Sequence, residues 1–195
     1  GNPEVAQISR GRTHFDAHRC NRCHQREHQL TSPAAPDLTY VTTALNPEWL
    51  IRKIKNDDSV AAHAKMPFFG FNEQQAEAIA AYLFANSKTA SLNKIPAAKK
   101  DKKTKKALTR EEEQREGEIL MRSVGCLACH TIDGKGNQQP FSGGDLSSIG
   151  DKRDTEWFFT WLSDPQKLNK DHRMPVIKLD TTERRQLAYA LSVFC

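Results

Sequence analysis

Apolar residues recur along this chain at helical spacing, and polar stretches of loop length separate them. The clearest example is a stripe at positions i, i+3, i+4, i+7 and i+8, formed by Ala76, Ile79, Ala80, Leu83 and Phe84. This spacing places all of these side chains on one face of an α-helix. We find no convincing alternation of apolar and polar residues that would predict a strand. The predicted fold class is therefore all-α.

Helix-start signals extend this pattern to three predicted helices in each half of the chain. Thr109 to Glu112 has the form of a capping box, and three apolar residues follow on one helical face: Leu120, Met121 and Val124. The matching region of the first half offers only Ile8 and Phe15, and we predict a helix there as well. The middle and last helices of each half are predicted to begin at N-cap residues: Asn46, Asn72, Asp154 and Asp180.

The two halves of the chain repeat each other. Gly11 aligns with Gly117 at an offset of 106, and from residue 37 onward the offset is 108. The pairs at the larger offset are Asp37–Leu38 with Asp145–Leu146, Glu48–Trp49 with Glu156–Trp157, Met66–Pro67 with Met174–Pro175, and Leu83 with Leu191. A two-residue insertion between Gly134 and Gly144 explains the shift. The pattern indicates a tandem duplication, with one domain over 1–86 and a second over 107–195.

The segment between the halves carries all the excess basic charge. Residues 1–86 have nine basic and nine acidic side chains, and residues 107–195 have twelve and fourteen. Residues 87–106 hold eight lysines and one aspartate. We predict that 87–106 is an extended, mobile linker, with a docking site for an acidic partner as the alternative. The net charge of +5 therefore does not indicate nucleic-acid binding.

Each half also contains the pentapeptide pattern C-x-x-C-H, at residues 20–24 and 126–130. Its members are Cys20, Cys23, His24, Cys126, Cys129 and His130. Two thiols at this spacing can reach the two vinyl groups along one haem edge, and the following histidine can bind the iron. Two motifs that use four of the five cysteines predict two covalently attached haem c groups.

Other uses of these cysteines fit less well. A four-cysteine zinc site needs pairs about fifteen to twenty residues apart, and these pairs lie about a hundred apart. A thioredoxin-like redox pair gives no reason for the histidine, and a disulfide across the motif would close a strained loop. Cys195 has no partner at the end of the chain. It is an incidental residue, a free thiol or the start of further sequence.

Two of the three methionines are predicted to be the sixth iron ligands. Met66 lies 42 residues after His24, Met174 lies 44 residues after His130, and both precede proline. A thioether favours ferrous iron, so histidine–methionine ligation raises the reduction potential. Met121 lies on the apolar face of a predicted helix and is expected to be a core residue.

Histidines near both Met-Pro motifs keep an alternative open. His63 and His172 lie three and two residues before the methionines and could bind iron in their place, which would lower the potential. Their positions do not match under the repeat, which favours methionine. Three other histidines are expected to face solvent: His14, His18 and His28.

Both halves resemble class I cytochrome c domains, and the whole chain except the linker resembles a dihaem tandem such as the cytochromes c4. The resemblance implies that the helix before each C-x-x-C-H motif crosses the last helix, with contacts at Gly11/Phe15 and Gly117/Met121. It also implies that the Pro36 carbonyl orients His24. The second half has Gly144 there, which keeps a carbonyl but not the stiff ring. Trp49 and Trp157 would lie near a haem propionate, or in the core. The long lysine-rich linker departs from the cytochromes c4.

These features predict an electron carrier rather than an enzyme. The chain would shuttle single electrons between redox partner proteins, whose identities the sequence does not give. The alternatives are a haem-bearing module of a larger redox enzyme and a dihaem peroxidase, which needs an open iron position. No run of eighteen apolar residues predicts a membrane span. Because haem is attached to this motif after export, we expect a removed signal peptide, a processing boundary at Gly1, and a periplasmic or otherwise exported protein.

Overall fold

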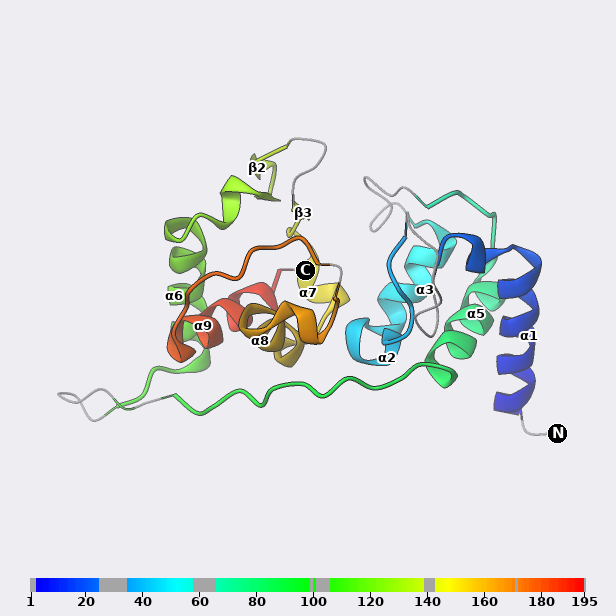
Figure 1. Ribbon diagram of the computed structural model, residues 1–195, viewed down its shortest axis with the longest axis horizontal. Coiled ribbons are helices and arrows are strands. Elements are labelled where there is room, and N and C mark those ends of the chain that lie inside the picture. Colours follow the sequence, from blue (N-terminus) through cyan, green and yellow to red (C-terminus); the bar gives the residue numbers. More distant parts are fainter. Residues whose placement is uncertain are drawn as a thin grey trace. The chain divides into compact units, whose positions relative to one another are not determined.

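The computed structural model describes residues 3–24, 35–57, 66–98, 100, 106–138, 143–170 and 172–194 (Figure 1). The chain divides into two compact units, unit 1 over Gly1–Ala90 and unit 2 over Ser91–Cys195. This division lies inside the segment 87–106 that the sequence predicts to be a linker. Most of the described secondary structure is helical. None of the described helices combines the length and the apolar character needed to cross a membrane.

Unit 1 is built on two helices that cross at a glycine. Its elements are α1 (Pro3–Ala17), a 3₁₀ turn η1 (Cys20–Arg22), α2 (Val41–Ala44), α3 (Pro47–Lys55) and α5 (Glu73–Ala85). Helices α1 and α5 lie side by side (Figure 1). A Cβ atom on Gly11 would lie 1.7 Å from the carbonyl oxygen of Ala78, so only glycine permits this approach. The predicted contact at Gly11 is therefore present.

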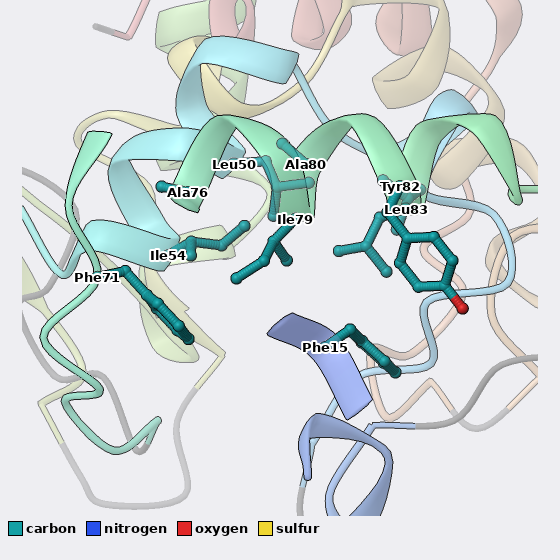
Figure 2. Packing of buried hydrophobic residues seen from close by; sticks show 10 residues of the cluster. Phe15, Leu50, Ile54, Phe71, Ala76, Ile79, Ala80, Tyr82 and Leu83 are labelled. Atoms are coloured by element: carbon teal, nitrogen blue, oxygen red, sulfur yellow. The ribbon is translucent and has the colours of Figure 1, made fainter. Parts of the chain in front are cut away.

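The core of unit 1 lies beneath the predicted apolar stripe of α5. Ala76, Ile79, Ala80 and Leu83 are all buried, and Phe84 packs against them at the margin. Figure 2 shows Phe15 from α1, Leu50 and Ile54 from α3, and Phe71 beside the stripe. The 3.6-residue period thus identified the buried face of this helix correctly.

Unit 2 repeats the same crossing with its own first and last helices. Its helical elements are α6 (Arg110–Ser123), η2 (Cys126–Ala128), α7 (Ile149–Lys152), α8 (Thr155–Ser163), η3 (Pro165–Lys167) and α9 (Thr181–Leu191). Helix α6 packs along α9, and a Cβ atom on Gly117 would lie 2.1 Å from the carbonyl oxygen of Gln186. Gln186 corresponds to Ala78 at the repeat offset of 108. Met121, the predicted core residue, is 3% exposed.

Three short strands in unit 2 correct the expectation of no strands. They are β1 (His130–Ile132), β2 (Lys135–Gly136) and β3 (Gly144–Asp145), in the order β2-β1-β3. Strand β1 pairs antiparallel with β2 and parallel with β3. Asp133 and Gly134 both have positive φ, 49° and 72°, as a two-residue hairpin turn requires. The Asp-Gly pair was the sequence signal for this hairpin, but the strands are too short to show an alternating pattern.

The helix starts agree with the predicted N-caps. The side chains of Asn72, Thr109 and Asp180 each accept a hydrogen bond from a backbone N–H of the first turn, and each completes a capping box. Asn46 caps α3 by accepting from the N–H of Glu48. Helix α8 begins after Asp154 as predicted, without a hydrogen bond from that side chain to the helix. Local capping chemistry therefore fixed the helix boundaries well.

The first part of the predicted linker is extended but is hydrogen-bonded. The Lys88 N–H donates to the Thr39 carbonyl over 2.7 Å, and the Ala90 N–H donates to Thr43 Oγ1 over 2.8 Å. Within unit 2, the Asn93 N–H donates over 2.8 Å to the buried hydroxyl of Thr160. The expectation of a free tether is wrong for these residues, because their backbone groups have partners within the adjoining unit.

Unit 2 also contains an ion pair that the sequence did not predict. Arg185 on α9 donates from Nε and Nη2 to the two carboxylate oxygens of Glu113 on α6, over 2.6 and 2.5 Å. Both side chains are 3% exposed. The repeat places Gln7 and Glu77 at the corresponding positions of unit 1. The pair therefore distinguishes the helix crossing of unit 2 from that of unit 1.

Candidate haem-binding sites

Each predicted haem motif begins with a tight turn that places its two cysteines. In unit 1 the Cys23 and His24 N–H groups donate to the Cys20 carbonyl, over 3.2 and 2.9 Å. In unit 2 the Cys129 N–H donates to the Cys126 carbonyl over 3.1 Å. Both turns are 3₁₀ elements, η1 and η2, and each follows directly after the first helix of its unit.

The residue before each turn has a left-handed backbone. Gly125 has φ 86°, and at the matching position Arg19 has φ 56°. Glycine adopts this conformation without a Cβ penalty, whereas arginine is disfavoured there. Both cysteine turns are therefore preceded by a residue with the same left-handed backbone conformation. Glycine favours this conformation in unit 2, whereas arginine does not in unit 1.

All four motif cysteines are free thiols. Burial raises the pKa of the Cys20 thiol, although its own backbone N–H lowers it, and burial likewise raises the pKa of Cys126. The Cys20 and Cys126 thiols are therefore neutral at pH 7 in the structure. Because the cysteines of each motif are three positions apart and unpaired, both remain available for thioether bonds.

A backbone carbonyl holds each motif histidine in one tautomer. His24 Nδ1 lies 2.9 Å from the Pro36 carbonyl oxygen, and His130 Nδ1 lies 3.1 Å from the Gly144 carbonyl oxygen. A carbonyl oxygen can only accept, so each Nδ1 carries a proton, and in the neutral ring Nε2 then has the lone pair. A neutral histidine with Nε2 available is the form that binds iron. The predicted hydrogen bonds are present in both units.

The loop that supplies each carbonyl is itself held by an aspartate. Asp37 Oδ1 accepts hydrogen bonds from the N–H and hydroxyl of Thr39, over 2.8 and 2.6 Å. Asp145 Oδ1 accepts from the hydroxyls of Ser147 and Thr131, over 2.7 and 3.0 Å. Burial raises the pKa of Asp145, but these hydrogen bonds outweigh it and hold that pKa below its ordinary value. The sequence analysis used these two aspartates only to align the two halves. Their hydrogen bonds within the loop are seen only in the structure.

The predicted methionine ligands follow the middle region of each unit and are half-buried. Met174 is fixed by a contact that the sequence did not predict: the indole N–H of Trp161 donates to its sulfur over 3.0 Å. Trp161 comes from α8 and stacks on Trp157, one turn earlier, with ring centroids 4.9 Å apart. Met66 and Met174 each lie two residues before an exposed apolar residue, Phe68 and Val176.

The remaining histidines differ from expectation in two cases. His172 donates from Nδ1 to the Met174 carbonyl over 2.9 Å and lies edge-on to Trp161. His14 and His18 are half-buried rather than solvent-facing, because both contact the ring of Phe71. Three residues of the sequence interpretation lie outside the described residues: His28, His63 and Cys195.

The tryptophans at matching repeat positions have different surroundings. Trp49 packs at the margin of the unit 1 core, whereas Trp157 is 7% exposed. The Arg153 guanidinium lies over the Trp157 ring, 3.7 Å from its centroid. Burial lowers the pKa of Arg153 to about 9, so it is charged at pH 7.

The residues of each unit fit a c-type haem. Each motif provides two free thiols and a histidine with an available Nε2, and the loop carbonyl that fixes this tautomer lies twelve or fourteen residues later in sequence. Among the described residues, no three His, Cys, Asp or Glu side chains gather into a site for a bare metal ion.

The comparison with known families supports this interpretation for unit 1. Residues 6–83, about two fifths of the chain, match the family model described as cytochrome C oxidase, cbb3-type, subunit III. The match supports a class I cytochrome c domain in unit 1, with covalently bound haem c, a haem-based electron-transfer role and redox partners. No curated protein and no solved structure shows significant similarity to the chain.

Proposed function

We propose that the chain is a dihaem c-type cytochrome that carries single electrons between redox partner proteins outside the cytoplasm. The observation that carries this proposal is the same histidine–carbonyl hydrogen bond at matching positions of both units. The family match covers unit 1 alone. The proposal extends the haem site to unit 2 because its thiols, its histidine tautomer and its helix crossing are those of unit 1.

The residues that would hold each haem follow from the described geometry. Cys20, Cys23 and His24 serve unit 1, and Cys126, Cys129 and His130 serve unit 2. Met66 and Met174 complete the two iron sites in the proposal. The haem iron supplies a reversible one-electron change between its ferric and ferrous states. The protein orients the proximal histidine through the loop carbonyl and fixes the basicity of that ligand.

An electron carrier is favoured over an enzyme because a histidine and a methionine would together hold each iron. No substrate would then need to reach the iron, and only an electron would enter or leave. Phe68 and Val176, at matching positions after the methionines, are 71% and 67% exposed. An exposed apolar side chain two residues after each proposed methionine ligand would suit weak, short-lived docking of partner proteins.

One alternative function, a haem-bearing module of a larger redox enzyme, is supported by the family match. The matching family is described as a subunit of an oxidase, which favours the interpretation that this chain is a haem-bearing module of a larger redox complex. The electron-carrying chemistry of the two units is the same in either case. A dihaem peroxidase would require one iron with an open sixth position.

Optical spectroscopy during a potentiometric titration of the holoprotein tests this function. We expect two one-electron steps and, in the ferric state, the far-red absorption of a sulfur-to-iron charge transfer. Rapid binding of carbon monoxide to one ferrous haem would contradict methionine closure there and favour the peroxidase alternative. A single step with half the haem content would contradict the dihaem assignment.

A further inference from the structure

Unit 2 supplies its methionine with an indole hydrogen-bond donor that has no counterpart at the matching position of unit 1. The indole N–H of Trp161 lies 3.0 Å from the sulfur of Met174. At the repeat offset of 108, Trp161 corresponds to Lys53 and Met174 corresponds to Met66. Lys53 is half-buried on α3, and it has no indole ring to stack beside a methionine. The position that supplies the indole donor in unit 2 therefore holds a different type of residue in unit 1.

The Trp161 ring is held in place from two sides. Its stack on Trp157 has an interplanar angle of 16°, and the edge of His172 meets it at 74°. His172 in turn donates to the backbone carbonyl of Met174, so the ring and the methionine backbone are tied together. The hydrogen bond to sulfur consequently comes from a fixed donor rather than from a rotating surface side chain.

A thioether sulfur has two lone pairs, so it can accept a hydrogen bond while the other lone pair faces a metal. The N–H draws electron density from the sulfur and makes it a poorer donor to iron. Ferric iron depends on ligand electron density more than ferrous iron does. A hydrogen bond to the methionine sulfur therefore favours the ferrous state and raises the reduction potential.

From these contacts we propose that Trp161 is a positioning residue for Met174, and that it makes the haem of unit 2 the higher-potential haem of the pair. A single electron on the protein at equilibrium would then reside mainly on the haem of unit 2. This inference rests on the proposed function, because it requires methionine ligation in unit 2.

The test is a potentiometric titration of the holoprotein and its Trp161→Phe variant, which keeps an aromatic ring but removes the N–H. The Met66→Ala and Met174→Ala variants assign each step to its unit. We expect the higher step to be the one that Met174→Ala displaces. Trp161→Phe should lower that step alone, changing its oxidised-to-reduced ratio at fixed potential about threefold to tenfold. A tenfold change is about 59 mV for a one-electron couple.

The Trp49→Phe variant is the control. It makes the same type of substitution in unit 1, at the position that corresponds to Trp157 because unit 1 has Lys53 in place of Trp161, and it should leave the step of unit 2 in place. An unchanged unit 2 step in Trp161→Phe overturns the inference, and so does assignment of the higher step to unit 1. If the Trp161→Phe variant does not retain haem, the wild-type titration still tests the inference, because the higher-potential step must belong to unit 2. A wild-type protein without the far-red sulfur band overturns this inference together with methionine ligation, whereas a retained band with an unshifted step overturns this inference alone.

Discussion

His130 and Gly144 meet through a hydrogen bond of 3.1 Å, at the position where His24 meets Pro36 over 2.9 Å in unit 1. Proline stiffens the loop of unit 1 through its ring. In unit 2 the parallel pairing of β1 with β3 places Gly144 opposite His130 instead. In unit 2, strand pairing therefore positions the loop that the proline ring stiffens in unit 1. The histidine donates to the same kind of partner in both units, a backbone carbonyl, although the residue that provides it differs.

Asp145 is expected to make the stability of this loop depend on pH. Its folded pKa is lowered, so its contribution is fully present above the unfolded pKa of about 3.9 and is lost as the pH falls through the folded value. Asp145→Asn should cost about 0.5 kcal/mol at pH 7, a small figure because the side chain is exposed and screened. Thermal unfolding from pH 7 downward measures this. A cost that stays the same below the folded pKa would contradict the assignment, and Ser147→Ala should weaken the same pH dependence.

The buried Glu113–Arg185 pair is expected to be costly to break from one side. Arg185→Met leaves a carboxylate buried between α6 and α9, and it should lower the free energy of unfolding of unit 2 by about 3 to 5 kcal/mol. The double variant Glu113→Leu/Arg185→Met removes both charges and should regain most of that loss. Urea unfolding of both variants measures the difference. Equal losses in the single and double variants would contradict a paired, desolvated interaction.

The left-handed residue before each cysteine turn predicts opposite effects for reciprocal substitutions. Gly125→Ala should destabilise unit 2 by about 1 to 2 kcal/mol from backbone strain alone, because an added Cβ there meets no atom within 4 Å. Arg19→Gly should stabilise unit 1 by about 0.5 to 1 kcal/mol, since the relieved strain exceeds the added chain entropy. Thermal unfolding of the holoprotein variants measures both. Destabilisation by Arg19→Gly would contradict this prediction, because it would show that the arginine side chain stabilises unit 1 by more than the backbone strain costs.

The hydrogen-bonded start of the lysine-rich segment predicts uneven proteolysis. Because the Asn93 N–H donates to the buried Thr160 hydroxyl, trypsin should cut slowly after Lys94 in the wild-type protein. Thr160→Val keeps the side-chain shape but removes the hydroxyl, and it should speed that cleavage severalfold. Mass spectrometry of timed digests measures the rates. Cleavage after Lys106 serves as the control and should not change; equal acceleration there would indicate general loosening of unit 2.

Much of this fold is predictable from the sequence because its signals are local. Capping residues such as Thr109 and Asn72 define helix starts, and the period of the α5 stripe defines its buried face. The repeat predicts that Gly11 and Gly117 occupy the same crossing, which the structure shows. The spacing of cysteine and histidine is equally local, and it is enough by itself to locate both candidate haem motifs.

The features that sequence reasoning missed depend on pairings that a linear pattern does not contain. Glu113 and Arg185 lie 72 residues apart, and neither residue type predicts burial until α6 and α9 cross. Trp161 looks like one more apolar residue of α8, and only the fold brings its N–H to Met174. Thr160 looks like an ordinary helix residue, yet its hydroxyl holds the segment predicted to be free. Each of these features is a polar contact between separate segments of the chain.

Mass spectrometry of the denatured holoprotein tests the central claim most directly. Covalent attachment through both motifs predicts a mass equal to the polypeptide plus two haem groups. Cys23→Ala and Cys129→Ala should each damage attachment in one unit only. A mass equal to the bare polypeptide would contradict the account of both sites, and a mass with one haem would contradict the account of one unit.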